Sequence, residues 1–199
     1  MTPIKVGLFC LLPLAGFLLV AAWHDIRSHR IPNYLVLGGS VLGLILNTVT
    51  PPGIGFLSEL PGGTGLIDAL AGLAIGLAVM LPLYFLRAMG AGDIKLMAMT
   101  GAFLGPREIL GAILGTFVAG GVLALVFAIR AGILKQVLQN IRIIIYAGAS
   151  KIHMGTLPIL DDSPNPAGKM PYAIAIASGT FGYLAWTAYR MDLGVLLNS

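Results

Sequence analysis

Long runs of apolar residues alternate with short polar segments along the whole chain. Six runs can be distinguished, at about residues 5–23, 33–48, 66–87, 94–104, 108–129 and 171–189. A helix that crosses a bilayer needs roughly 20 apolar residues, and roughly 17 is the lower limit. The pattern therefore predicts an all-α polytopic membrane protein with about six transmembrane helices, of which the second and the fourth are short.

The composition agrees with this class. Hydrophobic residues make up 57% of the chain and charged residues only 10%, whereas a soluble domain carries about 25% charged residues. The mean hydropathy is +0.93. We expect one integral-membrane domain over residues 1–199. The net charge of +4 mostly reflects where the loops lie, so nucleic acid is not an expected partner.

The basic residues predict an orientation. With the N-terminus outside, the cytoplasmic side collects nine of the 12 Lys and Arg residues, a positive-inside bias. The nine are Arg27, Arg30, Arg87, Lys95, Arg130, Lys135, Arg142, Lys151 and Lys169. The first run could instead be a secretory signal peptide, but Arg27 and Arg30 follow it at once and hold that end in the cytoplasm.

The long inner connection, residues 130–170, contains an amphipathic stretch. Its apolar residues fall on one helical face and its basic and amide residues on the other; the apolar ones are Leu134, Val137, Leu138, Ile141 and Ile145. This pattern predicts a helix lying in the cytoplasmic membrane interface, where anionic lipids are its expected contacts. Asp161 and Asp162 follow it, as a solvated acidic turn or as an attraction for a basic peptide.

Two carboxylates stand apart from the other acidic residues, which lie in loops or at outer helix ends. Asp25 lies at the inner end of the first run and Asp93 at the inner start of the fourth. Ionisable residues at membrane depth usually face the bundle interior and serve a function. The predicted topology puts both residues at the cytoplasmic boundary of the bilayer.

A carboxylate pair can hold one proton between its members, so that one acts as a base and the other as an acid. The helix start at Asp93 favours the charged form there, and the helix end at Asp25 favours the proton there. His24, His29 and His153 lack the spacing of a zinc site. We expect neither a metal nor a cofactor.

Residues beside the two carboxylates are candidates for shaping the site. Gly90 and Gly92 allow unusual backbone angles and leave room for another chain, although "GAGD" is also an ordinary helix-capping turn. Pro32 fixes a break before the second run, and Asn33 is placed to cap it. Lys95 points away from the nearby carboxylate on a helix, towards a lipid phosphate or a carbonyl.

Three motifs together resemble the type IV prepilin peptidases, the GxGD aspartic peptidases. "DIRSHRIPN" (25–33) is similar to their Asp-then-Ile-Pro-Asn signature, "GAGDIKLMAMTGAFLG" (90–105) to their GxGD motif, and "MPYAIAIASG" (170–179) to the start of their last span. The matches are in the right order and on the right side of the membrane. The chain resembles the short branch that serves tight-adherence (Flp) pili, because no cysteine-containing insert precedes Asp25.

The resemblance implies a function. It implies an endopeptidase of the inner membrane that cuts the leader from pilin-like precursors at the cytoplasmic face, with Asp25 and Asp93 as catalytic residues and without N-methylation. The alternative is a transporter or channel subunit in which the same two residues bind or relay a cation. A third interpretation is a non-catalytic assembly protein with the same fold. The sequence predicts no oligomeric state.

Overall fold

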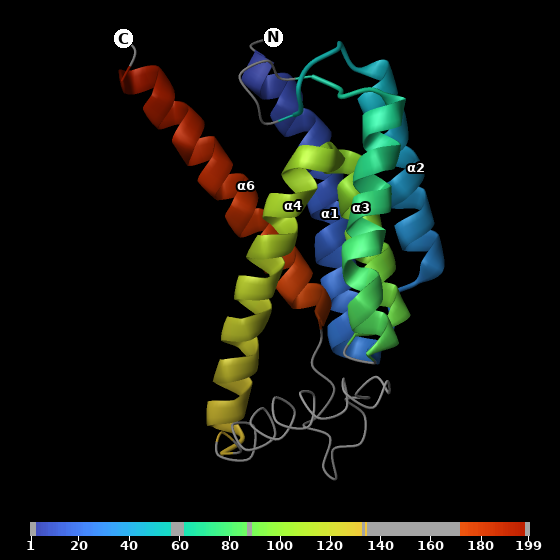
Figure 1. Ribbon diagram of the computed structural model, residues 1–199, viewed down its shortest axis with the longest axis vertical. Coiled ribbons are helices and arrows are strands. Elements are labelled where there is room, and N and C mark those ends of the chain that lie inside the picture. The colour runs from blue at the N-terminus through green and yellow to red at the C-terminus, as the bar shows by residue number, and fades with distance from the viewer. Residues whose placement is uncertain (1–2, 57–61, 87–88, 133, 135–171, 198–199) are drawn as a thin grey trace, which may run out of the picture.

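Five helices make up the described part of the computed structural model (Figure 1), which comprises residues 3–56, 62–86, 89–132, 134 and 172–197. They are α1 (Pro3–Ser28), α2 (Asn33–Val49), α3 (Leu66–Phe85), α4 (Ala91–Arg130) and α6 (Tyr172–Leu197). Within those ranges no β-strand forms, and one isolated bridge joins Pro52 to Gly63. The all-α prediction is confirmed for this part of the chain.

Among the described residues, three helical segments are long and apolar enough to cross a membrane, namely Cys10–Ser28, Leu66–Phe85 and Ala91–Arg130. The helix α2 is apolar but shorter, with 17 residues. These helices indicate a multi-pass membrane protein, whereas the count of six spans and the outer position of the N-terminus stay predictions. The interfacial helix expected in the 130–170 connection lies almost wholly outside the described residues, as do Asp161 and Asp162.

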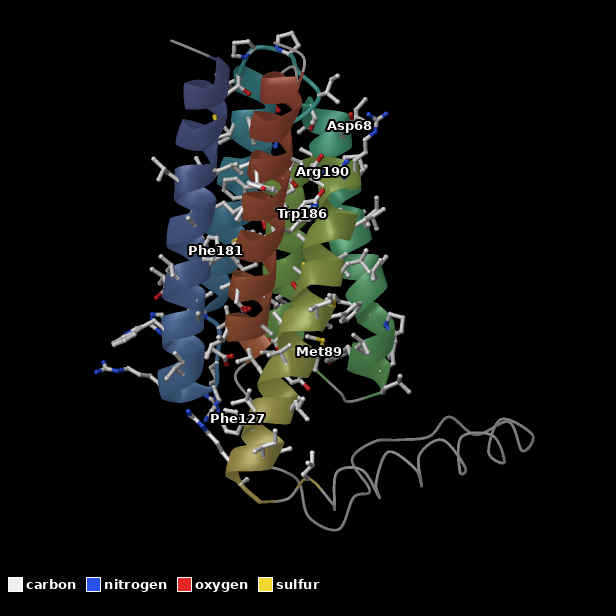
Figure 2. All side chains as sticks on the ribbon, turned by 90° about the vertical axis from the view of Figure 1, so that its left-hand side faces the viewer. Asp68, Met89, Phe127, Phe181, Trp186 and Arg190 are labelled. Atoms are coloured by element: carbon white, nitrogen blue, oxygen red, sulfur yellow. The ribbon has the colours of Figure 1, made fainter. Side chains whose placement is uncertain are left out.

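The runs expected at 94–104 and 108–129 form one helical element, α4, which reverses direction at Gly105. Gly105 has φ 78° and ψ −179°, a conformation that only glycine adopts readily. Figure 2 shows Met89, before α4, and Phe127, near its end, towards one end of the bundle, with Asp68 of α3 at the other. The chain therefore enters the bundle over 91–104 and returns over 106–130.

The 91–104 segment forms the centre of the bundle. All of its residues from Ile94 onward are buried except Lys95. Glycines on the neighbouring helices let it approach closely: a Cβ at Gly72 would overlap the carbonyl oxygen of Gly101, and one at Gly43 would lie 2.9 Å from the Phe103 ring. Small residues at such positions replace side-chain packing by backbone contact, as in other membrane helix pairs.

A buried amide fixes the reversal in place. Asn47, near the end of α2, is only 1% exposed. Its Nδ2 donates to the carbonyl oxygens of Ala102 and Phe103, each over 3.0 Å, and its Oδ1 accepts from the backbone N–H and hydroxyl of Thr64 at 3.0 and 3.1 Å. One side chain therefore joins α2, the connection before α3 and the end of the 91–104 segment.

Candidate active site

Asp25 lies on the buried face of α1, one turn before that helix ends. Leu14, Leu18 and Ala21 precede it on the same face and are 0% exposed, and the Asp25 side chain is 7% exposed. Its Oδ2 accepts a hydrogen bond from the backbone N–H of Ala173, over 3.1 Å. Because Ala173 is in the first turn of α6, the carboxylate of the first helix is held by the start of the last.

Asp93 lies in the first turn of α4 and is 8% exposed. Gly90 is the residue before this helix, and its N–H donates to Asp93 Oδ2 over 3.1 Å. In return, the Asp93 N–H donates to the Gly90 carbonyl oxygen over 3.2 Å. This reciprocal pair is a capping arrangement at the helix start, so the Asp93 side chain has a fixed direction.

The fold brings the two carboxylates together. Asp25 lies close enough to Asp93 for the charge of one to act on the other. Both are buried, and each accepts a backbone N–H, so neither depends on a side-chain cation among the described residues. The sequence predicts that both residues lie at the same membrane depth, and the structure adds their proximity.

The helix-end argument, which placed the negative charge on Asp93 and the proton on Asp25, does not separate the two residues. Asp25 does end a helix, but its carboxylate also meets the N-terminus of α6 through Ala173. The exposed N–H groups of a helix start favour negative charge, so both carboxylates receive the same kind of support. No local sequence pattern predicts this contact, because it joins α1 to α6.

The glycines of the "GAGD" segment act through space rather than through unusual backbone angles. Gly90 has φ −78° and ψ 154°, which any residue adopts, so the conformational argument for Gly90 was wrong. A Cβ at Gly90 would lie 3.3 Å from Asp93 Oδ2, and one at Gly92 would lie 3.2 Å from the Ile31 Cβ. The chain that approaches Gly92 is therefore the connection between α1 and α2.

Pro32 is the residue before α2, with φ −64° and ψ 132°, and its backbone marks the break that was expected there. Its carbonyl oxygen accepts from the Leu35 N–H over 3.2 Å. Asn33 does not cap α2, since no side-chain capping bond forms. Instead its Oδ1 accepts from Lys95 Nζ over 3.0 Å. Lys95 is exposed and reaches a side-chain carbonyl.

One further side chain lies at the carboxylate pair. Tyr172, the first residue of α6, is half-buried, and the charge of Asp93 acts on its phenol group. Tyr172 belongs to the stretch "MPYAIAIASG" and was not among the predicted site residues. Its position after a proline at the start of an apolar run was the available signal.

No three His, Cys, Asp or Glu side chains group as possible ligands of a metal ion within the described part of the chain. The side chains gathered at this end of the bundle are two carboxylates, a phenol and an exposed lysine paired with an amide. Chemically, such a set can exchange protons and donate hydrogen bonds.

Comparison with known proteins finds relatives of the chain. The sequence model described as "Type IV leader peptidase family" matches residues 12–125, a range that contains Asp25 and Asp93. A "Prepilin leader peptidase/N-methyltransferase" from Pseudomonas putida is 32% identical over 129 residues, which cover 57% of this chain and 41% of the relative. The match thus spans about two fifths of that relative's length. No solved structure matches the chain significantly.

Proposed function

The chain belongs to the type IV leader peptidase family, and from this premise we propose that it is a membrane aspartic endopeptidase. Its substrates are the precursors of type IV pilin-like proteins, from which it removes the leader. It acts at the cytoplasmic face of the inner membrane and leaves the new N-terminus unmethylated. Lipids, anionic ones among them, surround it.

The observation that carries the proposal is the pairing of Asp25 and Asp93, two buried carboxylates from different helices within electrostatic reach of each other. Burying one charge in an apolar bundle is costly, and burying two of the same sign is more so. The arrangement becomes favourable when the pair shares one proton. A carboxylate beside a carboxylic acid is the group set that hydrolyses peptide bonds in aspartic proteases.

In the proposed reaction, the ionised carboxylate takes a proton from a water molecule as that water attacks the scissile carbonyl carbon. The neutral carboxyl group gives its proton to the carbonyl oxygen. When the intermediate collapses, the carboxyl group that took the proton of the water gives it to the amide nitrogen, and the C–N bond breaks. The other carboxylate takes a proton from a hydroxyl of the intermediate, which restores the carbonyl group and the shared proton. The backbone N–H groups of Gly90 and Ala173 hold the two carboxylates in place during these transfers.

Charge at the two ends of the bundle supports the cytoplasmic location. Arg27, Arg30 and Lys95 are exposed at or near the end that holds the carboxylates. The opposite end carries the acidic residue Asp68 together with Arg190 (Figure 2). Under the positive-inside rule the carboxylate end faces the cytoplasm.

The proposal of cleavage without methylation rests on the residues before Asp25. They form an apolar run with one cysteine, Cys10, rather than a cysteine-containing insert. Analysis of the processed pilin by mass spectrometry tests this part of the proposal: an N-terminus 14 Da heavier would contradict it.

The central experiment is co-expression of the chain with a type IV pilin precursor from the same organism, followed by detection of the shortened product. Asp25→Asn and Asp93→Asn keep the shape of each side chain and remove its acid–base chemistry. Each should abolish cleavage, whereas Asp68→Asn, an exposed carboxylate of α3 at the far end, should not. Normal cleavage by either of the first two variants would contradict the assignment.

The same experiment separates the peptidase from the cation-binding alternative. A transporter or channel subunit produces no shortened pilin in any variant, and its two aspartates then change ion flux in vesicles. Cleavage by the unaltered protein, lost in both Asn variants, supports only the peptidase.

A further inference from the structure

The first turn of α6 is fixed against the carboxylate pair by a single backbone contact. Ala173 is 0% exposed, and its N–H donates to Asp25 Oδ2 over 3.1 Å. Tyr172 directly precedes it, so the backbone that carries the phenol is anchored to Asp25. The phenol itself lies within electrostatic reach of Asp93. The Tyr172 backbone therefore lies next to the residue that contacts Asp25, and its phenol faces the charge of Asp93.

The Tyr172 hydroxyl makes no hydrogen bond to another residue of the described ranges, whereas Tyr183 of the same helix donates to Glu108 Oε2 over 2.6 Å. A half-buried phenol O–H normally finds an acceptor. Among the described residues, the hydroxyl therefore keeps its proton for a group that enters the site.

We infer that the Tyr172 hydroxyl is a further catalytic group, which donates a hydrogen bond to the oxygen of the scissile carbonyl as that oxygen gains negative charge. The inference deepens the proposed peptidase function and rests on it. A neutral donor suits this role because it does not disturb the shared proton of Asp25 and Asp93. Donors aimed at a developing oxyanion stabilise the transition state more than the substrate.

The step balances without a proton from Tyr172. Water forms the new C–O bond and gives one proton to the ionised carboxylate. The electron pair of the carbonyl π bond moves to the oxygen, which receives the proton of the neutral carboxyl group. Tyr172 keeps its own proton throughout and contributes a hydrogen bond only.

The test is the kinetics of Tyr172→Phe on a fluorogenic peptide that spans the leader junction, with the full chain in nanodiscs. Loss of one oxyanion donor lowers kcat by about 10²–10³ in a well-studied protease. We expect a fall of about 10-fold to 100-fold here, because Tyr172 is only half-buried, with KM changed less than about twofold. Tyr189→Phe, which removes a hydroxyl from a 63% exposed residue of the same helix, is the matched control and should be unaffected.

A pair of inhibitors separates catalysis from structure. In the first, a peptide spanning the junction has its scissile amide replaced by a hydroxyethylene link, whose hydroxyl mimics the tetrahedral oxygen. In the second, a plain ethylene link removes that hydroxyl. Tyr172→Phe should weaken binding of the first by about the same factor as kcat and leave binding of the second unchanged. A purely structural residue would weaken both equally.

The outcomes are distinguishable. If the unaltered protein cuts the peptide and Tyr172→Phe keeps kcat within twofold, the inference about Tyr172 is wrong while the proposed function stands. Equal weakening of both inhibitors also overturns it, because the residue would then act on substrate binding or folding. If the unaltered protein cuts no pilin-derived peptide, the proposed function itself fails.

Discussion

The ammonium group of Lys95 donates a hydrogen bond to Oδ1 of Asn33 over 3.0 Å, and this contact joins the first turn of α4 to the first turn of α2. Asp93 lies in the same turn of α4. Both partners are exposed, so water competes for each of them. The contact therefore orients the starts of α2 and α4 near the carboxylates, and it contributes little to the free energy of unfolding.

A double-mutant cycle measures this alignment. Lys95→Met and Asn33→Ala should each lower the free energy of unfolding by less than about 1 kcal/mol, because an exposed hydrogen bond between a cation and an amide contributes no more than an exposed ion pair. Their coupling energy should be about 0.5 kcal/mol. Thermal unfolding in detergent gives the four values. A coupling above about 2 kcal/mol would contradict the exposed character of the contact.

Gly90→Ala tests the space beside Asp93. The backbone angles at Gly90 suit alanine, but the new Cβ would lie 3.3 Å from Asp93 Oδ2 and push the carboxylate by a few tenths of an ångström. Because small displacements of a reacting group are costly, cleavage should slow by about tenfold while the unfolding temperature stays within about 2 °C. The control is Gly38→Ala, where the Cβ meets nothing within 4 Å. Unchanged cleavage in Gly90→Ala would show that the carboxylate tolerates the contact.

Gly72→Ala tests the contact between α3 and the centre of the bundle. Its Cβ would overlap the Gly101 carbonyl oxygen and lie 2.7 Å from the Gly105 carbonyl carbon. Backbone atoms cannot rotate away, so we expect a loss of about 2–3 kcal/mol in the free energy of unfolding. Gly16→Ala has open space and should gain up to about 1 kcal/mol from helix propensity. Equal unfolding temperatures for the two variants would refute the close approach.

Asn47→Leu tests the buried amide that holds the reversal. The substitution leaves the carbonyl oxygens of Ala102 and Phe103 and the Thr64 N–H without that partner. A buried polar group without a partner costs about 1–3 kcal/mol. We expect a total loss of about 3 kcal/mol in the free energy of unfolding. Thr48→Val removes an exposed hydroxyl that bonds only within its own helix and should change stability by less than about 0.5 kcal/mol. A smaller loss in Asn47→Leu than in Thr48→Val would contradict the role of the amide.

The sequence predicts most of the helices because long apolar runs are bounded by residues that end helices. Pro32 and the Gly105–Pro106 pair mark breaks that the structure contains, since proline lacks the N–H of a helix interior and glycine adopts conformations closed to other residues. The sequence also predicts that Asp25 and Asp93 lie at one membrane depth, because few carboxylates occur there. Their proximity depends on how α1, α4 and α6 pack.

Contacts between distant segments were not predictable from local pattern. Asn47 resembles an ordinary polar residue at a helix end, yet it binds two separate segments. The Ala173 N–H belongs to a residue with no polar side chain, so its residue type does not indicate a partner for Asp25. Such contacts depend on how helices cross, and one sequence alone carries no record of that.

The reversal at Gly105 also has a consequence for the depth of the backbone in the membrane. The 91–104 segment is about 21 Å long at about 1.5 Å per residue, whereas the hydrocarbon layer is about 30 Å thick. A segment of this length cannot reach both surfaces of the layer. With Asp93 at one surface, the reversal at Gly105 lies at hydrocarbon depth, where the Asn47 amide gives the carbonyl oxygens of Ala102 and Phe103 a partner that lipid does not supply.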